Sequence, residues 1–408
     1  QRIKRFSRGG ATDYDILSGL PARPFLLIQM PKLTKYLAQR QDQRLSTCEL
    51  RLAKDIITSM PKTMLQVLSA EGIVQNGQSI PDLEPKEIFE LYRLMLLNRR
   101  IDERMIKLQR QGRIAFYVAS IGEEASIIGS AAALAKTDWI VPCYRELGAA
   151  LLRGFTLQEL CNQLFGNDQD TCKGRQMPNH YALPHLHYAS VSSPVGTQLP
   201  HATGLALGAK LTGKKDVALV YFGDGSTSTG DFHAAANFAG SLKAPVIFLC
   251  RNNQWAISVP VDRQTANPSL ASKAAAYGFE GVRVDGNDAL AVYNATRDAA
   301  EHARQGHGPV FIEAYTYRLT GHSTSDDPRS YRDDEEVRFW EDRDPLKRLR
   351  MYLMSEGHWN EKKERALETE MKEAILSAIR EAEAHGPPPI DTIFTDVFDE
   401  KPWNLREQ

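Results

Sequence analysis

The sequence predicts an α/β fold in which a parallel β-sheet is covered by helices on both faces. The strand candidates are five short apolar runs rich in β-forming residues, at 139–144, 217–222, 244–250, 281–286 and 309–317. Helical patterns lie between them, for example at 226–242 and 289–305. Because the strand candidates are apolar throughout rather than at every second position, each is expected to be buried on both faces.

Two helices are predicted ahead of this sheet. From 85 to 112 apolar residues recur at steps of three and four, as on one face of a helix. A second helix is expected to begin near Gly122. Glu123 and Glu124 would lie in its first turn, where acidic side chains suit the positive end of the helix dipole.

One large domain is expected to fill most of the chain. Residues 1–60 are interpreted as an irregular extension or interface arm, 61–390 as the α/β domain, and 391–408 as a C-terminal tail. The last long helix, 361–386, is charged along its length and is predicted to face solvent. A chain of 408 residues is long enough to bury a core of this size.

Composition argues against several classes of protein. The hydrophobic fraction of 42% and charged fraction of 25% are typical of a soluble globular protein. The net charge of −1 offers no attraction to nucleic acid or an anionic membrane, and no apolar stretch approaches the roughly 20 residues that span a bilayer. The five cysteines lack paired spacing, which favours a reducing compartment over disulfides or zinc. Asp13 and Asp15 follow the basic opening segment and argue against a targeting peptide.

The most informative segment runs from Gly223 to Asn253. A strand leads into Gly-Asp-Gly, a helix follows, and the next strand ends in Arg-Asn-Asn. Neighbouring parallel strands end at the same edge of a sheet, where open sheets bind ligands, so Asp224 is expected to lie near Asn253. Gly223 and Gly225 would let an anion approach the backbone, and a helix beginning at about Ser226 would offer free N–H groups to a phosphate.

Hard oxygen ligands beside a phosphate are what Mg²⁺ binds. The side chains of Asp224 and Asn253 are the predicted ligands, and the peptide carbonyl of Trp255 could add a third oxygen. A Gly-Asp-Gly turn can follow a strand by chance, but the double asparagine after the next strand weakens that interpretation. A dinucleotide site would need G-x-G-x-x-G, and Gly230 comes too late for it. The pattern resembles the diphosphate motif of thiamine diphosphate (ThDP) enzymes.

Further segments resemble the E1 α subunits of branched-chain 2-oxo acid dehydrogenases, a ThDP-dependent family. In chain order they are 109–125, 144–148, 166–181, 192–204, 251–258 and 316–332. The resemblance implies the ThDP-binding fold of the diphosphate-binding type. It implies oxidative decarboxylation of branched-chain 2-oxo acids, with acyl transfer to the lipoyl group of an E2 acyltransferase. It also implies an α₂β₂ heterotetramer, because the glutamate expected to pair with N1′ of the cofactor is not found in this chain and would come from the β subunit.

The same resemblance assigns the cofactor contacts. Arginine suits a diphosphate because its guanidinium can donate two parallel hydrogen bonds. His322 and Ser323 are the catalytic candidates; Ser323 also matches a serine that is phosphorylated in animal relatives, whereas Asp333 replaces the second such serine. The alternative is that Ser323 only orders its loop. The cofactor-binding candidates are Tyr144, Arg145, Ser193, Val195, Gly223, Asp224, Gly225, Ser226, Arg251, Asn253 and His322.

The segment 192–198 gathers hydroxyl and amide oxygens. The resemblance places a K⁺ ion among them, with Ser193 touching the cofactor and Val195 supporting its bent shape. The same oxygens could cap a helix with Pro194 near its first turn, and both interpretations can hold together. Tyr117 and His180 are expected to line the pocket for the 2-oxo acid. The predicted K⁺ ligands are Ser192, Pro194, Thr197 and Gln198.

Three other functions fit the sequence less well. The nearest is the α subunit of a pyruvate or acetoin dehydrogenase, but KGRQMPNHY and HSTSDDP resemble the branched-chain form more closely. A non-catalytic ThDP-binding subunit is a second alternative, and a nicotinamide-dependent reductase lacks its phosphate fingerprint. The expected location is the cytoplasm if the protein is bacterial and the mitochondrial matrix if it is eukaryotic.

Overall fold

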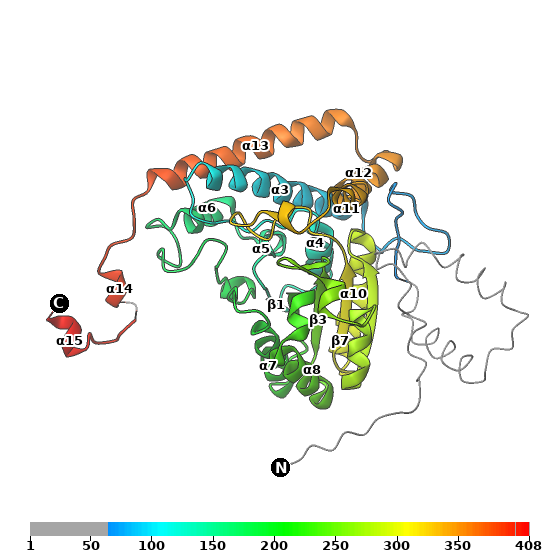
Figure 1. Ribbon diagram of the computed structural model, residues 1–408, viewed down its shortest axis with the longest axis horizontal. Helices are drawn as coiled ribbons and strands as arrows, with labels where there is room; N and C mark the ends of the chain where they lie inside the picture. The colour runs from blue at the N-terminus through cyan, green and yellow to red at the C-terminus, as the bar shows by residue number, and fades with distance from the viewer. Residues whose placement is uncertain (1–63, 396, 408) are drawn as a thin grey trace, which may run out of the picture. The chain divides into compact units, whose positions relative to one another are not determined.

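The computed structural model describes residues 64–395 and 397–407, so the predicted extension at 1–60 lies outside the described residues. The main sheet of the described residues has five parallel strands (Figure 1). Each strand overlaps a strand candidate predicted from the sequence. A short antiparallel pair, β4 (Trp255–Ala256) and β5 (Val259–Pro260), follows the third strand. The order across the main sheet is β1 (Trp139–Val141), β2 (Ala218–Gly223), β3 (Val246–Asn252), β7 (Val310–Tyr315) and β6 (Glu280–Asp285).

Helices cover both faces of this sheet, as predicted. One core cluster lies under α3 (Pro85–Arg110), α4 (Glu124–Ala132), α5 (Leu147–Arg153), α10 (Ala289–Arg304), α12 (Pro345–Ser355) and α13 (Glu361–Ala384). The other lies under α7 (Gln198–Leu211), α8 (Gly230–Leu242) and the 3₁₀ helix η3 (Leu270–Tyr277). The remaining helices are α6 (Leu157–Phe165), α9 (Val261–Gln264), α11 (Asp334–Glu341), α14 (Thr392–Thr395) and α15 (Trp403–Arg406), with short 3₁₀ turns η1 (Pro184–Leu186), η2 (Asp224–Ser228) and η4 (Pro328–Ser330).

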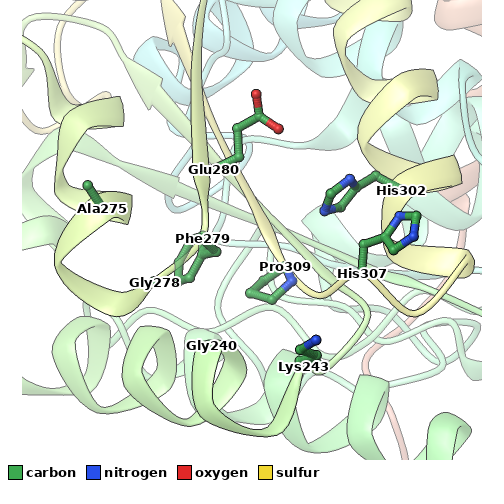
Figure 2. Close-up of a pocket in the computed structure, with 9 residues that line it drawn as sticks. All are labelled: Gly240, Lys243, Ala275, Gly278, Phe279, Glu280, His302, His307 and Pro309. Atoms are coloured by element: carbon green, nitrogen blue, oxygen red, sulfur yellow. The ribbon is translucent and has the colours of Figure 1, made fainter.

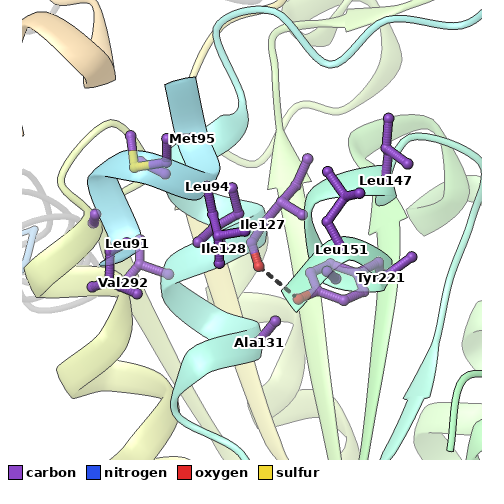
Figure 3. Packing of buried hydrophobic residues seen from close by; sticks show 14 of the residues in the cluster. Leu91, Leu94, Met95, Ile127, Ile128, Ala131, Leu147, Leu151, Tyr221 and Val292 are labelled. Atoms are coloured by element: carbon purple, nitrogen blue, oxygen red, sulfur yellow. Dashed lines mark hydrogen bonds between the residues drawn. The ribbon is translucent and has the colours of Figure 1, made fainter. Parts of the chain in front are cut away.

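Alternation along the central strands explains how both faces are filled. In β2, Leu219 and Tyr221 belong to the first cluster, whereas Val220 and Phe222 belong to the second. Successive side chains of a strand point to opposite faces, so a continuously apolar strand needs helices on both sides. Figure 3 shows Tyr221 reaching α4, where its hydroxyl donates to the carbonyl of Ile127 at 3.0 Å.

The prediction that the last long helix faces solvent is wrong for one of its faces. In α13 the side chains of Met371, Ile375, Ala378, Ile379 and Ala382 are buried in the first core cluster. They recur at steps of three and four, which is the stripe of an amphipathic helix. None of the helices in the described part of the chain is long and apolar enough to cross a membrane.

Close contact between α4 and α10 depends on Gly129. A Cβ on Gly129 would lie 2.6 Å from the backbone carbonyl oxygen of Ala289. We expect Gly129→Ala to lower the free energy of unfolding by about 1–3 kcal/mol, because overpacking against a rigid backbone outweighs the ~1 kcal/mol gain in helix propensity. Urea unfolding of the purified chain measures this effect.

The control is Gly204→Ala in α7, where a Cβ would meet nothing within 4 Å. There the propensity gain of at most ~1 kcal/mol should appear alone. Equal effects at the two positions would contradict the close contact.

Candidate functional site

Asp224 and Asn253 lie at the carboxyl ends of β2 and β3, the two strands predicted to bring them together. The strands pair in parallel, with Gly223 opposite Arg251. Asp224 is 1% exposed, and its Oδ2 atom has no hydrogen-bond partner. Burial raises the pKa of this carboxyl to about 7. A carboxylate buried without a compensating partner is costly, so this position favours a bound cation.

The predicted helix start at Ser226 is wrong by about one turn. Residues after β2 form the 3₁₀ helix η2, and α8 begins only at Gly230, where the side chain of Thr229 accepts from the backbone N–H of Phe232. Threonine is a preferred N-cap because its oxygen satisfies a free N–H of the first turn. The amides near Ser226 therefore belong to a tight turn rather than to an α-helix N-terminus.

The two glycines of the Gly-Asp-Gly turn have different surroundings. A Cβ on Gly223 would meet nothing within 4 Å, so this backbone is open to a ligand, as predicted. A Cβ on Gly225 would lie 2.9 Å from the Cβ of Ala256 in β4. Gly225 therefore permits close packing of the turn against the β4–β5 hairpin.

Arg251 is buried between two glutamates that the sequence did not mark as site residues. Its Nη1 atom donates to Glu123 at 2.6 Å, and its Nη2 atom donates to Glu146. All three side chains are at most 3% exposed. The terminal nitrogens predicted to contact the diphosphate are thus ion-paired within the protein, and Nε is the nitrogen without a partner.

Asn253 is held by contacts on both of its amide atoms. Its Nδ2 atom donates to Glu123 at 3.0 Å, and its Oδ1 atom accepts from the backbone N–H of Trp255 at 3.2 Å. The carbonyl oxygen of Trp255, the predicted third metal ligand, accepts from Nη1 of the buried Arg318 at 3.2 Å. A carbonyl oxygen has two lone pairs, so this contact leaves one for a cation.

Tyr144, Arg145 and His322 form a second group. Arg145 Nη1 donates to the carbonyl of Ala119 at 2.6 Å, and Nη2 lies 3.0 Å from His322 Nδ1. The Tyr144 ring meets the imidazole edge-on, with centroids 5.9 Å apart. Burial and the cations of Arg145 and Arg318 lower the pKa of His322 to about 3. His322 is therefore neutral near pH 7. Because the guanidinium can only donate, Nδ1 accepts and Nε2 carries the proton.

The loop after His322 is cross-braced. Asp326 accepts from the backbone N–H of His322 at 2.6 Å and from the hydroxyl of Tyr331. Arg332 Nη1 donates to the carbonyl of Arg318 at 2.6 Å. Ser323 lies in this braced loop, and its Oγ accepts from the backbone N–H of Ser325 at 3.2 Å.

The predicted K⁺ ligands cluster at the start of α7. Thr197 Oγ1 donates to the carbonyl of Pro194 at 3.1 Å and contacts Ser192 Oγ. Gln198 donates through Nε2 to the carbonyl of Tyr221 in β2 at 2.9 Å, while its buried Oε1 has no partner. Thr197 is the N-cap position of α7 but makes no side-chain cap hydrogen bond, and Pro194 lies three residues before it. Val195, expected to support the cofactor, is exposed in this chain.

Tyr117 and His180, the predicted pocket residues, differ in surroundings. Tyr117 is fully buried, and its hydroxyl donates to Asp102 at 2.7 Å. His180 Nδ1 donates to the carbonyl of Pro178 at 3.0 Å, which leaves Nε2 to accept from the hydroxyl of Ser193. His180 and Ser193 are thus in contact, whereas the hydroxyl of Tyr117 is used within the interior.

A separate cavity of about 360 Å³ lies at the opposite edge of the sheet, where β6 and β7 begin (Figure 2). The rings of His302 and His307 lie 5.0 Å apart beside it, near Lys243 and Pro309. None of the predicted site residues lines this cavity. Asp224 and Asn253 instead follow the carboxyl ends of β2 and β3, the edge where open α/β sheets bind ligands.

Comparison with known proteins identifies the family. The family model described as dehydrogenase E1 component matches residues 92–391. The chain belongs to this family. Its members depend on thiamine diphosphate, which agrees with the cofactor predicted from the Gly-Asp-Gly and Asn-Asn motif.

Curated relatives cover most of the chain. It is 48% identical over 339 residues to 2-oxoisovalerate dehydrogenase subunit alpha 2, mitochondrial, of Arabidopsis thaliana, which covers 82% of this chain and 72% of the relative. The Mus musculus α subunit of the same name is 41% identical, with 87% and 80% covered. That of Caenorhabditis elegans is 43% identical, with 92% and 86% covered. The family and fold predicted from the sequence are confirmed.

Proposed function

We propose that this chain is the α subunit of a branched-chain 2-oxo acid dehydrogenase E1 component, 3-methyl-2-oxobutanoate dehydrogenase (2-methylpropanoyl-transferring). Its reaction would be the oxidative decarboxylation of a branched 2-oxo acid, with the acyl group passed to a lipoyl group. The names of the relatives support this substrate class over pyruvate or acetoin. The structural observation that carries the proposal is the buried, unpartnered Asp224 oxygen at the end of β2, next to the strand that leads to Asn253.

These residues fit a ThDP–Mg²⁺ site. No three His, Cys, Asp or Glu side chains gather as a metal site in the described part of the chain. A cation here would therefore rely on one carboxylate, one amide oxygen, the Trp255 carbonyl and phosphate oxygens, the all-oxygen set that Mg²⁺ prefers. When bound, ThDP supplies the carbon nucleophile and the electron sink for decarboxylation.

The residues around the cation would bind and orient the diphosphate. Arg145 provides a permanent charge, and the neutral His322 provides an Nε2–H donor that does not titrate near pH 7. Tyr144 packs against that imidazole and would orient it. Arg251 would contribute through Nε, since its terminal nitrogens are held by glutamates. The remaining proposed cofactor contacts are Ser193, Val195, Gly223, Gly225 and Ser226.

His180 and Ser193 would form the substrate side of the site. His180 Nε2 accepts the hydroxyl of Ser193, so the pair can hold a proton at a defined atom close to the reacting group. Tyr117 would shape this pocket from behind through its ring, since its hydroxyl is committed to Asp102. Ser323, which follows His322, remains our proposed catalytic and regulatory position on the same loop.

We assign the oxygens at the start of α7 to a K⁺ ion. Ser192, Thr197 and the Pro194 carbonyl already converge, and the unpartnered Oε1 of Gln198 would complete the set. We expect Thr197→Val to abolish stabilisation by K⁺, because it removes one ligand oxygen with little change in shape. At a K⁺ concentration 100 times its Kd that stabilisation amounts to about 2.7 kcal/mol.

Thermal unfolding in potassium and in choline buffers measures this dependence. Thr203→Val serves as the control: it lies on the same helix, its hydroxyl donates to the carbonyl of Leu199 at 3.1 Å, and it does not touch the cluster. This variant should keep the full response to K⁺. A response retained by Thr197→Val would argue that these oxygens only hold the turn before α7 together.

The proposed partners are an E1 β subunit, in an α₂β₂ assembly, and a lipoyl-bearing E2 acyltransferase. The β subunit is expected to supply the glutamate for N1′ of the cofactor, so the α chain alone should be inactive. The relatives are named as mitochondrial proteins. We propose the mitochondrial matrix for a eukaryotic source and the cytoplasm for a bacterial one.

Decarboxylation by the chain co-expressed with its β partner tests the function. With ThDP and Mg²⁺ present, CO₂ release is compared for 3-methyl-2-oxobutanoate, 4-methyl-2-oxopentanoate and pyruvate. We expect the two branched acids to be preferred. Preference for pyruvate would move the enzyme to the other subclass, and ThDP binding without CO₂ release would favour a non-catalytic subunit.

A further inference from the structure

We propose that Glu123 is a positioning residue that fixes the orientation of the Asn253 amide, so that its oxygen faces the metal ion. This inference rests on the proposed Mg²⁺ site. Glu123 immediately precedes α4, far in sequence from both metal-binding turns, and it is fully buried. Its hydrogen bond to a proposed metal ligand is the one to Asn253. Burial raises the pKa of Asp224, and toward that carboxyl Glu123 acts only through its charge, which raises the pKa further.

The geometry gives each oxygen of Glu123 one donor. Oε1 accepts from Asn253 Nδ2 at 3.0 Å, and Oε2 accepts from Arg251 Nη1 at 2.6 Å. Both carboxylate oxygens of Glu123 act as hydrogen-bond acceptors, one toward Arg251 and one toward Asn253. Glu123 therefore selects the NH₂ end of the amide, because the opposite orientation would place two acceptor oxygens against each other.

That selection decides whether Asn253 can bind a cation. A half-turn about the last side-chain bond exchanges the oxygen and the NH₂ group, and only the oxygen can coordinate Mg²⁺. In the observed orientation Oδ1 accepts from the backbone N–H of Trp255 at 3.2 Å and keeps a second lone pair. Glu123 thus stabilises the ligand-competent orientation before any metal arrives.

Glu146 provides a matched comparison within the same cluster. It is equally buried and also accepts from Arg251. Its Oε2 atom accepts from the backbone N–H groups of Cys143 at 2.9 Å and Arg145 at 3.0 Å, and it makes no contact with Asn253. Loss of either glutamate removes one of the two carboxylates that pair with Arg251. Only loss of Glu123 also removes the hydrogen bond that holds the Asn253 amide.

Glu123→Gln is the sharpest test because a glutamine can offer one oxygen and one NH₂ group. Its oxygen should stay on Arg251, since a bond to a charged donor is the stronger one. The NH₂ group then faces Asn253 and turns the amide, so that its NH₂ end replaces the ligand oxygen. We expect the affinity for the metal to fall about 10- to 100-fold, the usual effect of losing a residue that orients a metal ligand.

The measurement is Mn²⁺ binding by electron paramagnetic resonance, with the chain assembled with its β partner and saturated with ThDP. Glu146→Gln should keep the Mn²⁺ Kd within about threefold of the original protein. Adding Asn253→Asp to Glu123→Gln should restore binding, because a carboxylate presents an oxygen in either orientation and the total charge is conserved. Thermal unfolding checks that each variant is folded.

The outcomes separate this inference from the proposed function. If the unaltered protein binds no Mn²⁺, or if Asn253→Ala binds it equally well, the metal site itself is wrong. If Asn253 matters but Glu123→Gln binds normally, or Glu146→Gln loses as much, the positioning role is wrong. If Glu123→Gln alone does not fold, Mn²⁺ binding is compared between Asn253→Asp and the double variant Glu123→Gln, Asn253→Asp. A tenfold weaker affinity of the double variant would also overturn the proposal.

Discussion

Asp224→Asn is expected to reduce decarboxylation by about 100- to 1,000-fold while making the cofactor-free chain more stable. The substitution removes the only carboxylate proposed to hold Mg²⁺ and keeps the shape of the side chain. Charge stabilisation by a bound metal is worth several kcal/mol, and each 1.4 kcal/mol is a factor of ten. Initial rates with 3-methyl-2-oxobutanoate, at saturating ThDP and Mg²⁺, measure the loss.

The gain in stability follows from the raised pKa of Asp224. Burial moves the pKa of this carboxyl from its ordinary 3.8 to about 7 in the folded chain. Between these values the folded chain retains a proton that the unfolded chain releases, so stability falls as pH rises through this window. At pH 8, without metal, the ionised carboxylate costs on the order of 2–4 kcal/mol, which Asp224→Asn should recover.

Asp102 is the control for this stability effect. Burial also raises the pKa of Asp102 to about 7. It accepts from the hydroxyl of Tyr117, the Nδ2 of Asn98, and both the backbone N–H and the hydroxyl of Ser120. Asp102→Asn should destabilise the chain because it replaces an acceptor by a donor facing these groups. A stabilising effect at both positions, or at neither, would contradict the view that Asp224 lacks a partner.

Arg251→Met is expected to lower the free energy of unfolding by about 3–5 kcal/mol, the usual cost of removing one partner from a buried ion pair. It leaves the carboxylates of Glu123 and Glu146 fully buried without their cation. Burial already raises the pKa of Glu146. If this carboxyl takes up a proton once Arg251 is removed, the proton would offset only part of the lost stability. Urea unfolding of the chain without cofactor measures the effect, which a residue that served only to contact phosphate would not show.

Two further variants test the cause. Adding Glu123→Gln and Glu146→Gln to Arg251→Met should restore much of the stability, because no buried charge is then left unpaired. Arg329→Met breaks the ion pair with Asp327 at the surface, where the side chains are 84% and 58% exposed, and should change stability little. A small effect of Arg251→Met, equal to that at Arg329, would mean that the buried pair is not needed for folding.

The glutamates of the site show where local pattern is insufficient. Glu124 lies in the first turn of α4 as predicted, whereas Glu123 is the N-cap residue just before it. The helix pattern does not tell which distant residues either side chain contacts. The contacts from Glu123 to Arg251 and Asn253 span 128 and 130 positions in the chain. Sequence spacing carries no information about such a contact, because it depends on how α4 packs beside β3.

The hydrogen-bond partners of backbone carbonyls also cannot be predicted from the sequence. The carbonyl of Trp255 accepts from Arg318, 63 positions away. Because every residue has a carbonyl, the sequence does not indicate which side chain will contact it. By contrast, the start of α8 at Gly230 had a local signal: Thr229 is a preferred N-cap residue just before the helix. The predicted start at Ser226 is too early because the serines and threonine before Thr229 form a 3₁₀ turn instead of the first turn of the α-helix.

The sequence alone determined the parallel sheet and the family, and it placed Asp224 and Asn253 after neighbouring parallel strands. Apolar runs follow the burial of each strand, and consecutive parallel strands joined by one helix must end at the same edge. Only the tertiary structure decided what surrounds those two residues: the glutamates that neutralise Arg251, the amide orientation of Asn253, and the unpartnered oxygens of Asp224 and Gln198. Strand positions follow from patterns along the chain, whereas strand order, charge balance and unsatisfied hydrogen bonds depend on how distant segments pack together.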